Sequence, residues 1–220
     1  AVLSGANLAG ANLFGTNLVA VQFDGADLSG ASLTGANALN VNLSGAVLVG
    51  TTLASTTLKA ANLTGADLTD AQASNATLMD ADLTDATLNG ADLQGANLEG
   101  ANLANADLTG VELKNVHAIS LAACPQALPA AWLCMSSCLV GAKADLTNAN
   151  LSGADLTGLD LTDVVFSSAD LSGASLTGAD LSGASLDAAV LTGVISGDLA
   201  GTPDVLPAQW LLMQGYLVGP

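Results

Sequence analysis

The sequence predicts an all-β solenoid, and two kinds of internal repetition carry that prediction. The first is a period of five residues, seen for example in Ala61-Asn62-Leu63-Thr64-Gly65 and in the units that follow it. A helix repeats its apolar face every 3.6 residues and a strand every 2, so neither accounts for a period of five. A chain that bends at each unit accounts for the period of five, with Leu and Ala pointing inward and the other three residues facing water. One such coil cannot bury its Leu layer alone, so we expect the coils to stack.

The five-residue unit, written A-(N/D)-L-x-x, resembles the repeat of the pentapeptide-repeat proteins. The resemblance covers residues 1–116 and 144–198, which is most of the chain. It implies a right-handed quadrilateral β-helix in which four units make one square coil. At four units per coil the two tracts amount to about 8 coils. We expect Leu and Phe23 inside this β-helix and the Asn/Asp residues outside it.

A coil of four units places residues 20 positions apart directly above one another. In the position before the central residue, most carboxylates then have a neutral neighbour. Only Asp92 over Glu112 and Asp160 over Asp180 stack like charges, which repel at a spacing of about 5 Å. We expect the Asn columns to pass amide hydrogen bonds from coil to coil, as in other stacked-strand structures.

The second repetition is longer and interrupts the first. The period of five fails over residues 117–143, and ten residues of this segment recur 78 positions later, within 199–220. The shared part predicts a β-hairpin, in the second copy an apolar arm at 210–213, a Gln214-Gly215 turn and a return arm at 216–218. The domain plan is therefore tract 1 (1–116), an insertion (117–143), tract 2 (144–198) and a second copy of the insertion motif (199–220).

The hairpins carry both tryptophans and the one tyrosine of the chain. Such an aromatic face must lie on something, either the flank of the solenoid or a partner. The candidates for an association surface are Trp132, Trp210, Met213, Tyr216 and Leu217.

Three cysteines, Cys124, Cys134 and Cys138, lie in the first insertion, and the second copy replaces all three. We expect a disulfide between Cys124 and Cys134, with Cys124 to Cys138 as the rival pairing. A disulfide indicates an oxidising compartment, whereas three buried thiols would fit a reducing one. The cysteines lack a CxxC zinc pattern and the one histidine, His117, is alone, so no metal site is predicted.

Composition argues against several function classes. There are 3 Lys and no Arg against 20 acidic residues, for a net charge of -17, which disfavours direct nucleic-acid binding. No run approaches the roughly 18 apolar residues of a membrane-spanning helix. No constellation of nucleophile and base is present, so we predict no catalytic residues, no cofactor and no enzyme activity.

Two functions remain. The first is a structural, self-associating module, extracellular or displayed on the cell surface, whose copies stack head to tail into an array or filament. An open solenoid end is an exposed sheet edge, and such edges pair unless they are capped. The second follows from the family resemblance, which includes acidic rods that imitate DNA and bind type II topoisomerases such as DNA gyrase. A protein of that kind would act in the cytoplasm.

Overall fold

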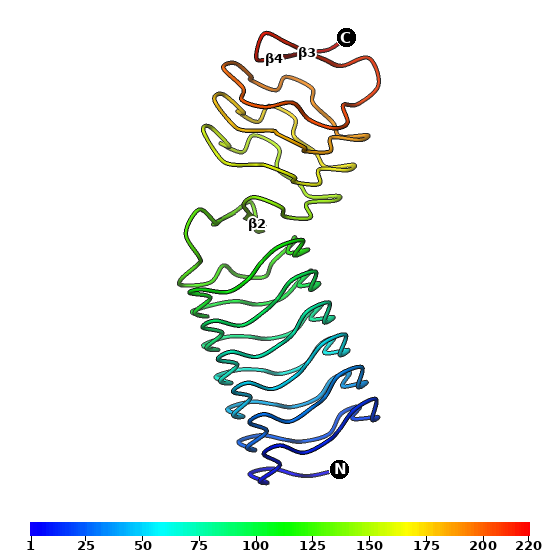
Figure 1. The fold of residues 1–220 in the computed structure, drawn as a ribbon, viewed down its shortest axis with the longest axis vertical. Coiled ribbons are helices and arrows are strands. Elements are labelled where there is room, and N and C mark those ends of the chain that lie inside the picture. Colours follow the sequence, from blue (N-terminus) through cyan, green and yellow to red (C-terminus); the bar gives the residue numbers. More distant parts are fainter. The chain divides into compact units, whose positions relative to one another are not determined.

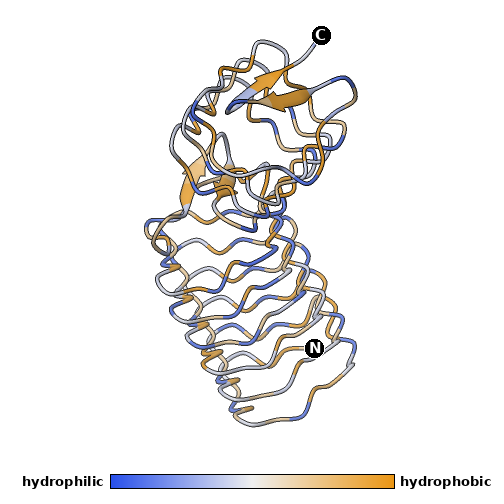
Figure 2. Ribbon diagram, turned by 45° about the horizontal axis from the view of Figure 1, so that its top comes forward, coloured by the Kyte–Doolittle hydropathy of each residue, from blue (hydrophilic) through white to orange (hydrophobic).

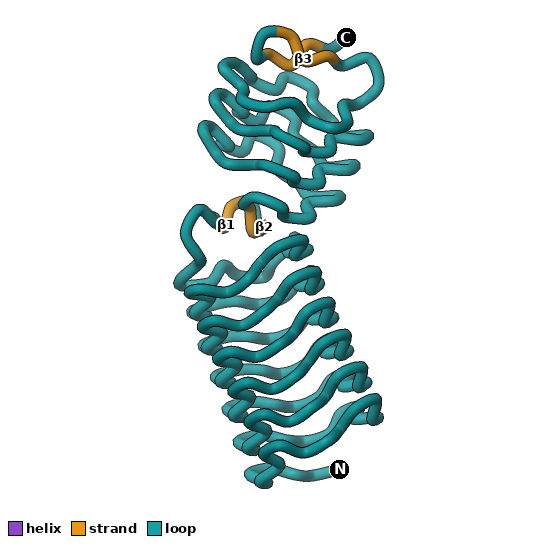
Figure 3. Tube along the Cα trace, viewed as in Figure 1, coloured by secondary structure: helices purple, strands orange, loops and turns teal.

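The computed structural model describes residues 1–220 and contains four short strands and no helix. The strands are β1 (Leu133–Met135), β2 (Cys138–Val140), β3 (Leu211–Met213) and β4 (Tyr216–Val218). The rest of the backbone consists of turns and isolated bridges, drawn as loops in Figure 3. Nothing in the structure is a helix long and apolar enough to cross a membrane. The chain divides into unit 1 (Ala1–Ala130) and unit 2 (Ala131–Pro220), and each is described by itself (Figure 1).

Each coil takes 20 residues, as the period of five predicts. Parallel bridges join the second residue of nearly every unit to the residue 20 positions ahead, so Asn42 pairs with Asn62 and Asn62 with Asp82. At each bridge the backbone bonds in both directions along the stack. The N–H of Asn62 donates to the carbonyl of Val41 at 2.9 Å, and the N–H of Leu43 donates to the carbonyl of Asn62 at 2.7 Å. Four such bridges per turn make a four-sided β-helix.

The corner of each coil is made by the last residue of the unit, which has a positive φ. At Gly65 φ is 64°, and at Ala60, where glycine is missing, it is 53°. A turn closes over this residue, since the N–H of Ala66 donates to the carbonyl of Leu63 at 3.0 Å. Glycine adopts this conformation without strain, which explains why it is the most common residue in that position.

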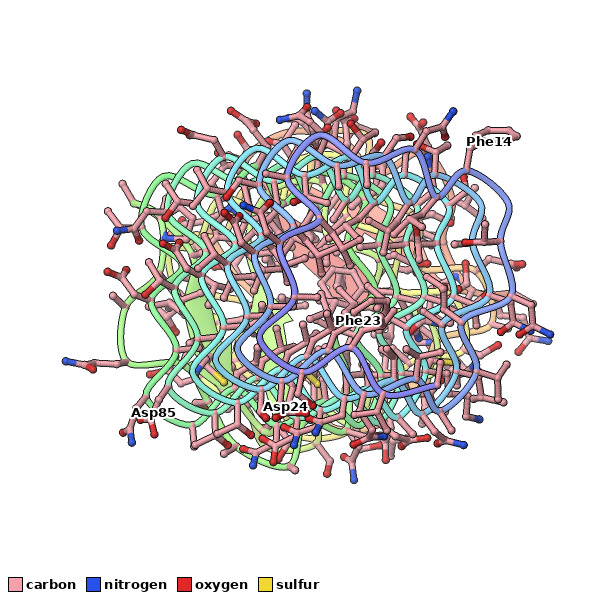
Figure 4. All side chains as sticks on the ribbon, turned by 90° about the horizontal axis from the view of Figure 1, so that it is seen from below. Phe14, Phe23, Asp24 and Asp85 are labelled. Atoms are coloured by element: carbon pink, nitrogen blue, oxygen red, sulfur yellow. The ribbon has the colours of Figure 1, made fainter.

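The interior of the coils is filled by the central Leu and the preceding Ala, which are almost completely buried beyond the first coil. Figure 4, seen along the stack, shows Phe23 pointing inward while Phe14, Asp24 and Asp85 point outward. Phe23 is fully buried in the same coil as Ala38, the small residue that stands where most units have Leu. The inside and outside faces are therefore those that the sequence predicts.

The outward Asn and Asp side chains bond mainly within their own unit. Asp82 Oδ1 accepts the backbone N–H of Thr84 at 3.0 Å and its hydroxyl at 2.6 Å. Bonds from coil to coil are fewer, for example Asn42 Nδ2 to Gln22 Oε1 at 3.1 Å. The expected amide ladder is thus only fragmentary. A carbonyl oxygen on a side chain this short reaches the N–H two residues ahead more readily than a partner in the next coil.

The ladder of bridges also continues beyond the tracts of regular sequence. In unit 1 it reaches Ala127, through the pairs Asn97–His117, Asn102–Ala123 and Asp107–Ala127. In unit 2 it reaches Val205, which pairs with Ser185. The bridges are made by backbone atoms, so they persist where the side-chain pattern has already been lost. Each hairpin thus follows directly on a coil that the period of five does not reveal.

Candidate association surface

The two hairpins have the same register. In the first, Leu133 pairs with Val140 and Met135 with Cys138; in the second, Leu211 pairs with Val218 and Met213 with Tyr216. The β3–β4 arms and turn are those that the sequence predicts. Both turns have two central residues with positive φ, which is the conformation of the tight primed hairpin turns. These residues are Ser136 and Ser137 in the first hairpin, and Gln214 and Gly215 in the second.

Each tryptophan stands next to a glycine of its own hairpin. The ring of Trp132 fills the space beside Gly141, and the ring of Trp210 does the same at Gly219, so neither glycine has room for a side chain. Both indoles are half-buried. The tryptophans therefore support the hairpins from within and contribute only part of their surface to solvent.

The two hairpins differ in how much of them is covered. All three residues of β2 are buried, with Cys138 at 1% exposure and Val140 at 0%. In β4 only Leu217 is buried, while the residues equivalent to those two, Tyr216 and Val218, are 51% and 45% exposed. Because neighbouring residues of a strand point to opposite faces, β2 is covered on both faces and β4 on one.

The outer edge of β4 and the turn of its hairpin are held against the coil of their own unit. The N–H of Leu217 donates to Ser196 Oγ at 3.0 Å, and the N–H of Leu199 donates to the carbonyl of Gly215 at 3.2 Å. The ring of Tyr216 lies beside Gly197, where an added Cβ would come within 3.1 Å of it. The hairpin is thus held against residues 196–199 along the edge of β4 and by one side of the Tyr216 ring, while most of the face that carries Tyr216 is left open.

The open face consists of four apolar side chains at alternate positions of β3 and β4, and Figure 2 colours these two strands largely as hydrophobic. We call it the platform, made of Leu211, Met213, Tyr216 and Val218, all of them more than 40% exposed. Of the residues that the sequence analysis proposed for association, Met213 and Tyr216 lie on it. Leu217 points the other way and is buried. Leu211 and Val218 were missed, although the alternation of a strand could have indicated them.

The cysteines form one disulfide. Cys124 and Cys134 are disulfide-bonded, and Cys138 keeps its thiol, which is buried and donates to the carbonyl of Ser136 at 3.4 Å. This is the pairing preferred from the sequence. Cys138 pairs with Met135, which is the neighbour of Cys134 in β1. Neighbouring residues of a strand point to opposite faces, so Cys134 and Cys138 lie on opposite faces of the hairpin.

The acidic side chains are mostly solvated and lie on the outward sides. Several of them accept hydrogen bonds from the Ser or Thr two residues ahead. The side-chain bond and then the backbone bond from Ser182 hold the pKa of Asp180 below its usual value, and the bonds from Thr109 do the same to the pKa of Asp107.

Lys59 and Lys143 lie near carboxylates, at 3.8 Å from Asp80 and 3.9 Å from Asp163. No three His, Cys, Asp or Glu residues are grouped as metal ligands would be.

The sequence profile of the family described as pentapeptide repeats matches eight copies in this chain. The matched residues are 1–30, 46–85, 81–117, 144–183 and 169–195. The chain belongs to the pentapeptide-repeat family. With the coils described above, membership makes the fold a β-helix of the pentapeptide-repeat type. A comparison with curated proteins found no match.

Several solved structures of pentapeptide-repeat proteins are similar to the chain. Rfr23 from the cyanobacterium Cyanothece 51142 is 40% identical over 42% of this chain and 59% of its own, with a TM-score of 0.37. HetL from the cyanobacterium Nostoc sp. strain PCC 7120, a protein involved in heterocyst differentiation regulation, is 30% identical over 90% of this chain and 86% of its own, with a TM-score of 0.30. QnrB1, a plasmid-mediated fluoroquinolone resistance protein, is 19% identical over 94% of this chain and 91% of its own, with a TM-score of 0.41.

Proposed function

We propose that this pentapeptide-repeat protein is a non-enzymatic assembly module, and that its platform receives the edge of a coil from a second copy. The observation that carries the proposal is the difference between the hairpins. The same fold, with the same register, is covered on both faces at β2 and on one face at β4. Four neighbouring apolar side chains at the open face form a patch of the kind that marks a binding surface.

The first hairpin indicates which kind of element can follow such a hairpin. A pentapeptide coil follows it at once, since the N–H of Ala144 donates to the carbonyl of Gly141 at 3.2 Å and the coil continues through Leu146 and Leu151. Within unit 2, hairpin and coil are thus consecutive elements. The sequence Leu-Val-Gly leads into the coil at residues 139–141, and it recurs at 217–219. A coil is therefore the covering element that the duplicated segment itself suggests for the platform.

A second copy offers a coil edge of matching chemistry. In the coil of residues 1–20 the inward residues Leu3, Leu8 and Leu13 are partly exposed, whereas the equivalent leucines of the coils above are buried. Contact with the platform would remove apolar surface from water on both sides, at roughly 25 cal/mol per Å². Because the two contacting surfaces differ, the association would be heterologous, and such contacts generate open filaments unless the rotation closes a ring.

The test is the dependence of size on concentration, measured by light scattering. We expect wild-type protein to form a concentration-dependent series of oligomers. The double variant Met213→Ser/Tyr216→Ser should shift that series to concentrations at least about tenfold higher, since loss of about 1.4 kcal/mol is a factor of ten. Val47→Ser, at an exposed apolar position in the side of a unit 1 coil, serves as the control and should behave as wild type. Oligomers of equal strength in all three proteins would contradict the proposal, and so would a monomer at every concentration.

The disulfide supports an extracytoplasmic location for this module, because such bonds form and persist in oxidising compartments. Cys124 and Cys134 are bonded in the structure. Alkylation of the protein as it comes from its native cells, followed by mass spectrometry, tests this directly. We expect one modified cysteine, Cys138, under denaturing conditions. Three modified cysteines would place the protein in a reducing compartment.

A second candidate function rests on charge. The net charge of -17 suits an acidic rod that binds a type II topoisomerase such as DNA gyrase. The acids are spread over several sides of the coils, for example Asp82, Asp107 and Glu112. Stoichiometric inhibition of gyrase supercoiling would support this candidate. Lack of inhibition under conditions in which the protein self-associates would favour the assembly module.

A further inference from the structure

The acidic residues are distributed unevenly along the chain. All 20 of them lie between Asp24 and Asp204. Residues 1–23 and 205–220 carry no charged side chain, and we call them the neutral segments. They contain the two surfaces that the proposed function brings together, the coil edge of residues 1–20 and the platform. The net charge of -17 is therefore carried by the part of the chain between these surfaces.

The neutral segments also hold most of the large apolar side chains that face water. In the first, Val2 and Phe14 are 76% and 68% exposed, and Phe14 points outward in Figure 4. The second contains the four residues of the platform. Exposed apolar surface marks sites of contact, whereas a high net charge keeps molecules apart. The two properties are thus separated along this chain.

The coils of unit 1 beyond the first have one large apolar side chain that is clearly exposed, that of Val47 at 37%. In its column of residues 20 apart, Asp27 lies in the coil before it and Asp67 in the coil after it. Stacked strands are about 4.8 Å apart and the Debye length at physiological ionic strength is about 8 Å. Both carboxylates therefore act on any surface that covers Val47.

Hydrogen bonds hold these two carboxylates in place. Asp27 Oδ1 accepts the N–H of Ser29 at 3.0 Å and its hydroxyl at 2.6 Å. Asp67 Oδ1 accepts the same two groups of Thr69 at 3.0 Å and 2.6 Å. Turning either carboxylate away from an approaching surface would break these bonds. A surface placed on Val47 therefore meets two fixed negative charges.

A second copy has no side free of acids to place against Val47. Each of the four sides of unit 1 carries at least one acid, among them Asp82, Asp92, Glu99 and Asp107. The chain has three lysines, two of which already lie near carboxylates. Carboxylates of both copies would face one another across a contact between sides, which weakens it.

We propose that the acids decide where copies of this protein meet. They keep the sides of the coils apart and leave the neutral segments for contact, so self-association selects the coil edge and the platform and strengthens with ionic strength. Charges beside exposed apolar segments suppress unwanted pairing in many β proteins. This inference rests on the proposed function for the identity of the two contacting surfaces, and it adds how their contact is selected and regulated.

The first test uses the background Met213→Ser/Tyr216→Ser, in which contact through the platform is weakened. Asp27→Asn/Asp67→Asn removes the charges on either side of Val47 and keeps acceptors for the N–H groups two residues ahead. We expect attraction between copies, measured as a lower second virial coefficient in static light scattering. Adding Val47→Ser to this variant should restore the original coefficient.

The matched control, Asp82→Asn/Asp92→Asn, removes the same charge from columns without an exposed apolar residue. Asp82 lies between Asn62 and Asn102, and Asp92 is flanked by Gln72 and Glu112. This control should lower the coefficient much less than Asp27→Asn/Asp67→Asn does. Equal shifts in the two pairs, or a shift that persists with Val47→Ser, would overturn the inference.

The second test is the salt dependence of wild-type association. The neutral segments supply no ion pairs to the contact, so the association constant should rise several-fold between about 0.05 M and about 0.5 M sodium chloride, as repulsion is screened. An association that weakens with salt would overturn the inference. Wild type that associates no more than Met213→Ser/Tyr216→Ser would contradict the proposed function instead, and the first test then decides the inference alone.

Discussion

The hairpins β1–β2 and β3–β4 show how one duplicated motif can have two structural roles. Both have the same register, the same two-residue turn and a tryptophan beside a glycine. In the first hairpin β2 is covered on both faces, Leu133 of β1 is 42% exposed, and Cys134 forms a disulfide. In the second the motif presents four apolar side chains to solvent. The identity of a hairpin thus fixes its shape, whereas its surroundings decide whether its apolar face is core or surface.

The sequence differences between the two copies agree with this difference in burial. Cys138, buried at β2, is replaced by Tyr216, exposed at β4. A small thiol suits a covered position, and an amphipathic tyrosine suits a position that is open in the single chain and useful in contacts. The substitution enlarges the side chain where there is space for it. Substitutions at equivalent positions of the two copies test whether burial accounts for these differences.

The two hairpins should differ most in unfolding free energy when a charge is introduced at the last residue of each. Val140→Asp would bury an unpaired carboxylate and should lower the free energy of unfolding by about 3 kcal/mol or more. Val218→Asp, at the equivalent exposed position, should change it by less than about 0.5 kcal/mol. Urea unfolding of the two variants at low protein concentration measures both effects. Equal destabilisation would mean that the two hairpins are covered to the same extent.

A smaller difference is expected at the turns. Gly215 has a φ of 79°, and a Cβ there would lie 3.2 Å from the backbone nitrogen of Leu199. Gly215→Ala should therefore destabilise β3–β4 by about 1 to 2 kcal/mol. Ser137 has a φ of 59° without being glycine, so Ser137→Gly should stabilise β1–β2 by roughly 0.5 kcal/mol. Hydrogen exchange of the hairpin amides reports each change locally, and effects of the same sign in both turns would refute this account.

Much of this structure follows from the sequence because a strict repeat reports both period and face. The burial of Leu63 and Phe23, the stacking of residues 20 apart and the Gln214-Gly215 turn were all predictable in this way. The preferred disulfide between Cys124 and Cys134 also followed, because the arm that begins at Trp132 can return past the bend between Pro125 and Pro129.

Three features did not follow, each for a physical reason. The coil of unit 1 runs on to Ala127 because backbone bridges do not require the repeat residues. The direction of Leu217 was missed because alternation places Tyr216 and Leu217 on opposite faces of β4 without showing which of the two faces is buried. The fragmentary state of the amide ladder depends on a competition between two bonds, the local one to the N–H two residues ahead and the distant one to the next coil. Residue types alone do not decide that competition.

The smallest expected effect concerns pH and distinguishes the coil that contains Asp170 and Asp180 from the next coil, which contains Val190 and Ile195. The side-chain and then the backbone bond from Ser172 lower the pKa of Asp170 from its ordinary value of 3.8, and Asp180 is affected by Ser182 in the same way. A carboxyl whose pKa is lower in the folded state contributes stability that is present above pH 4 or so and is lost as the pH falls through the folded pKa. The coil of Val190 and Ile195 has no carboxylate at those two positions, so acid should weaken it less.

Asp170→Asn keeps an acceptor that does not titrate, and it should therefore reduce the acid sensitivity of the amide of Ser172 while leaving its protection at neutral pH unchanged. Hydrogen exchange between pH 3 and 6, corrected for the intrinsic rate, measures this. A variant that loses protection in acid as wild type does would show that the carboxylate of Asp170 does not stabilise its turn.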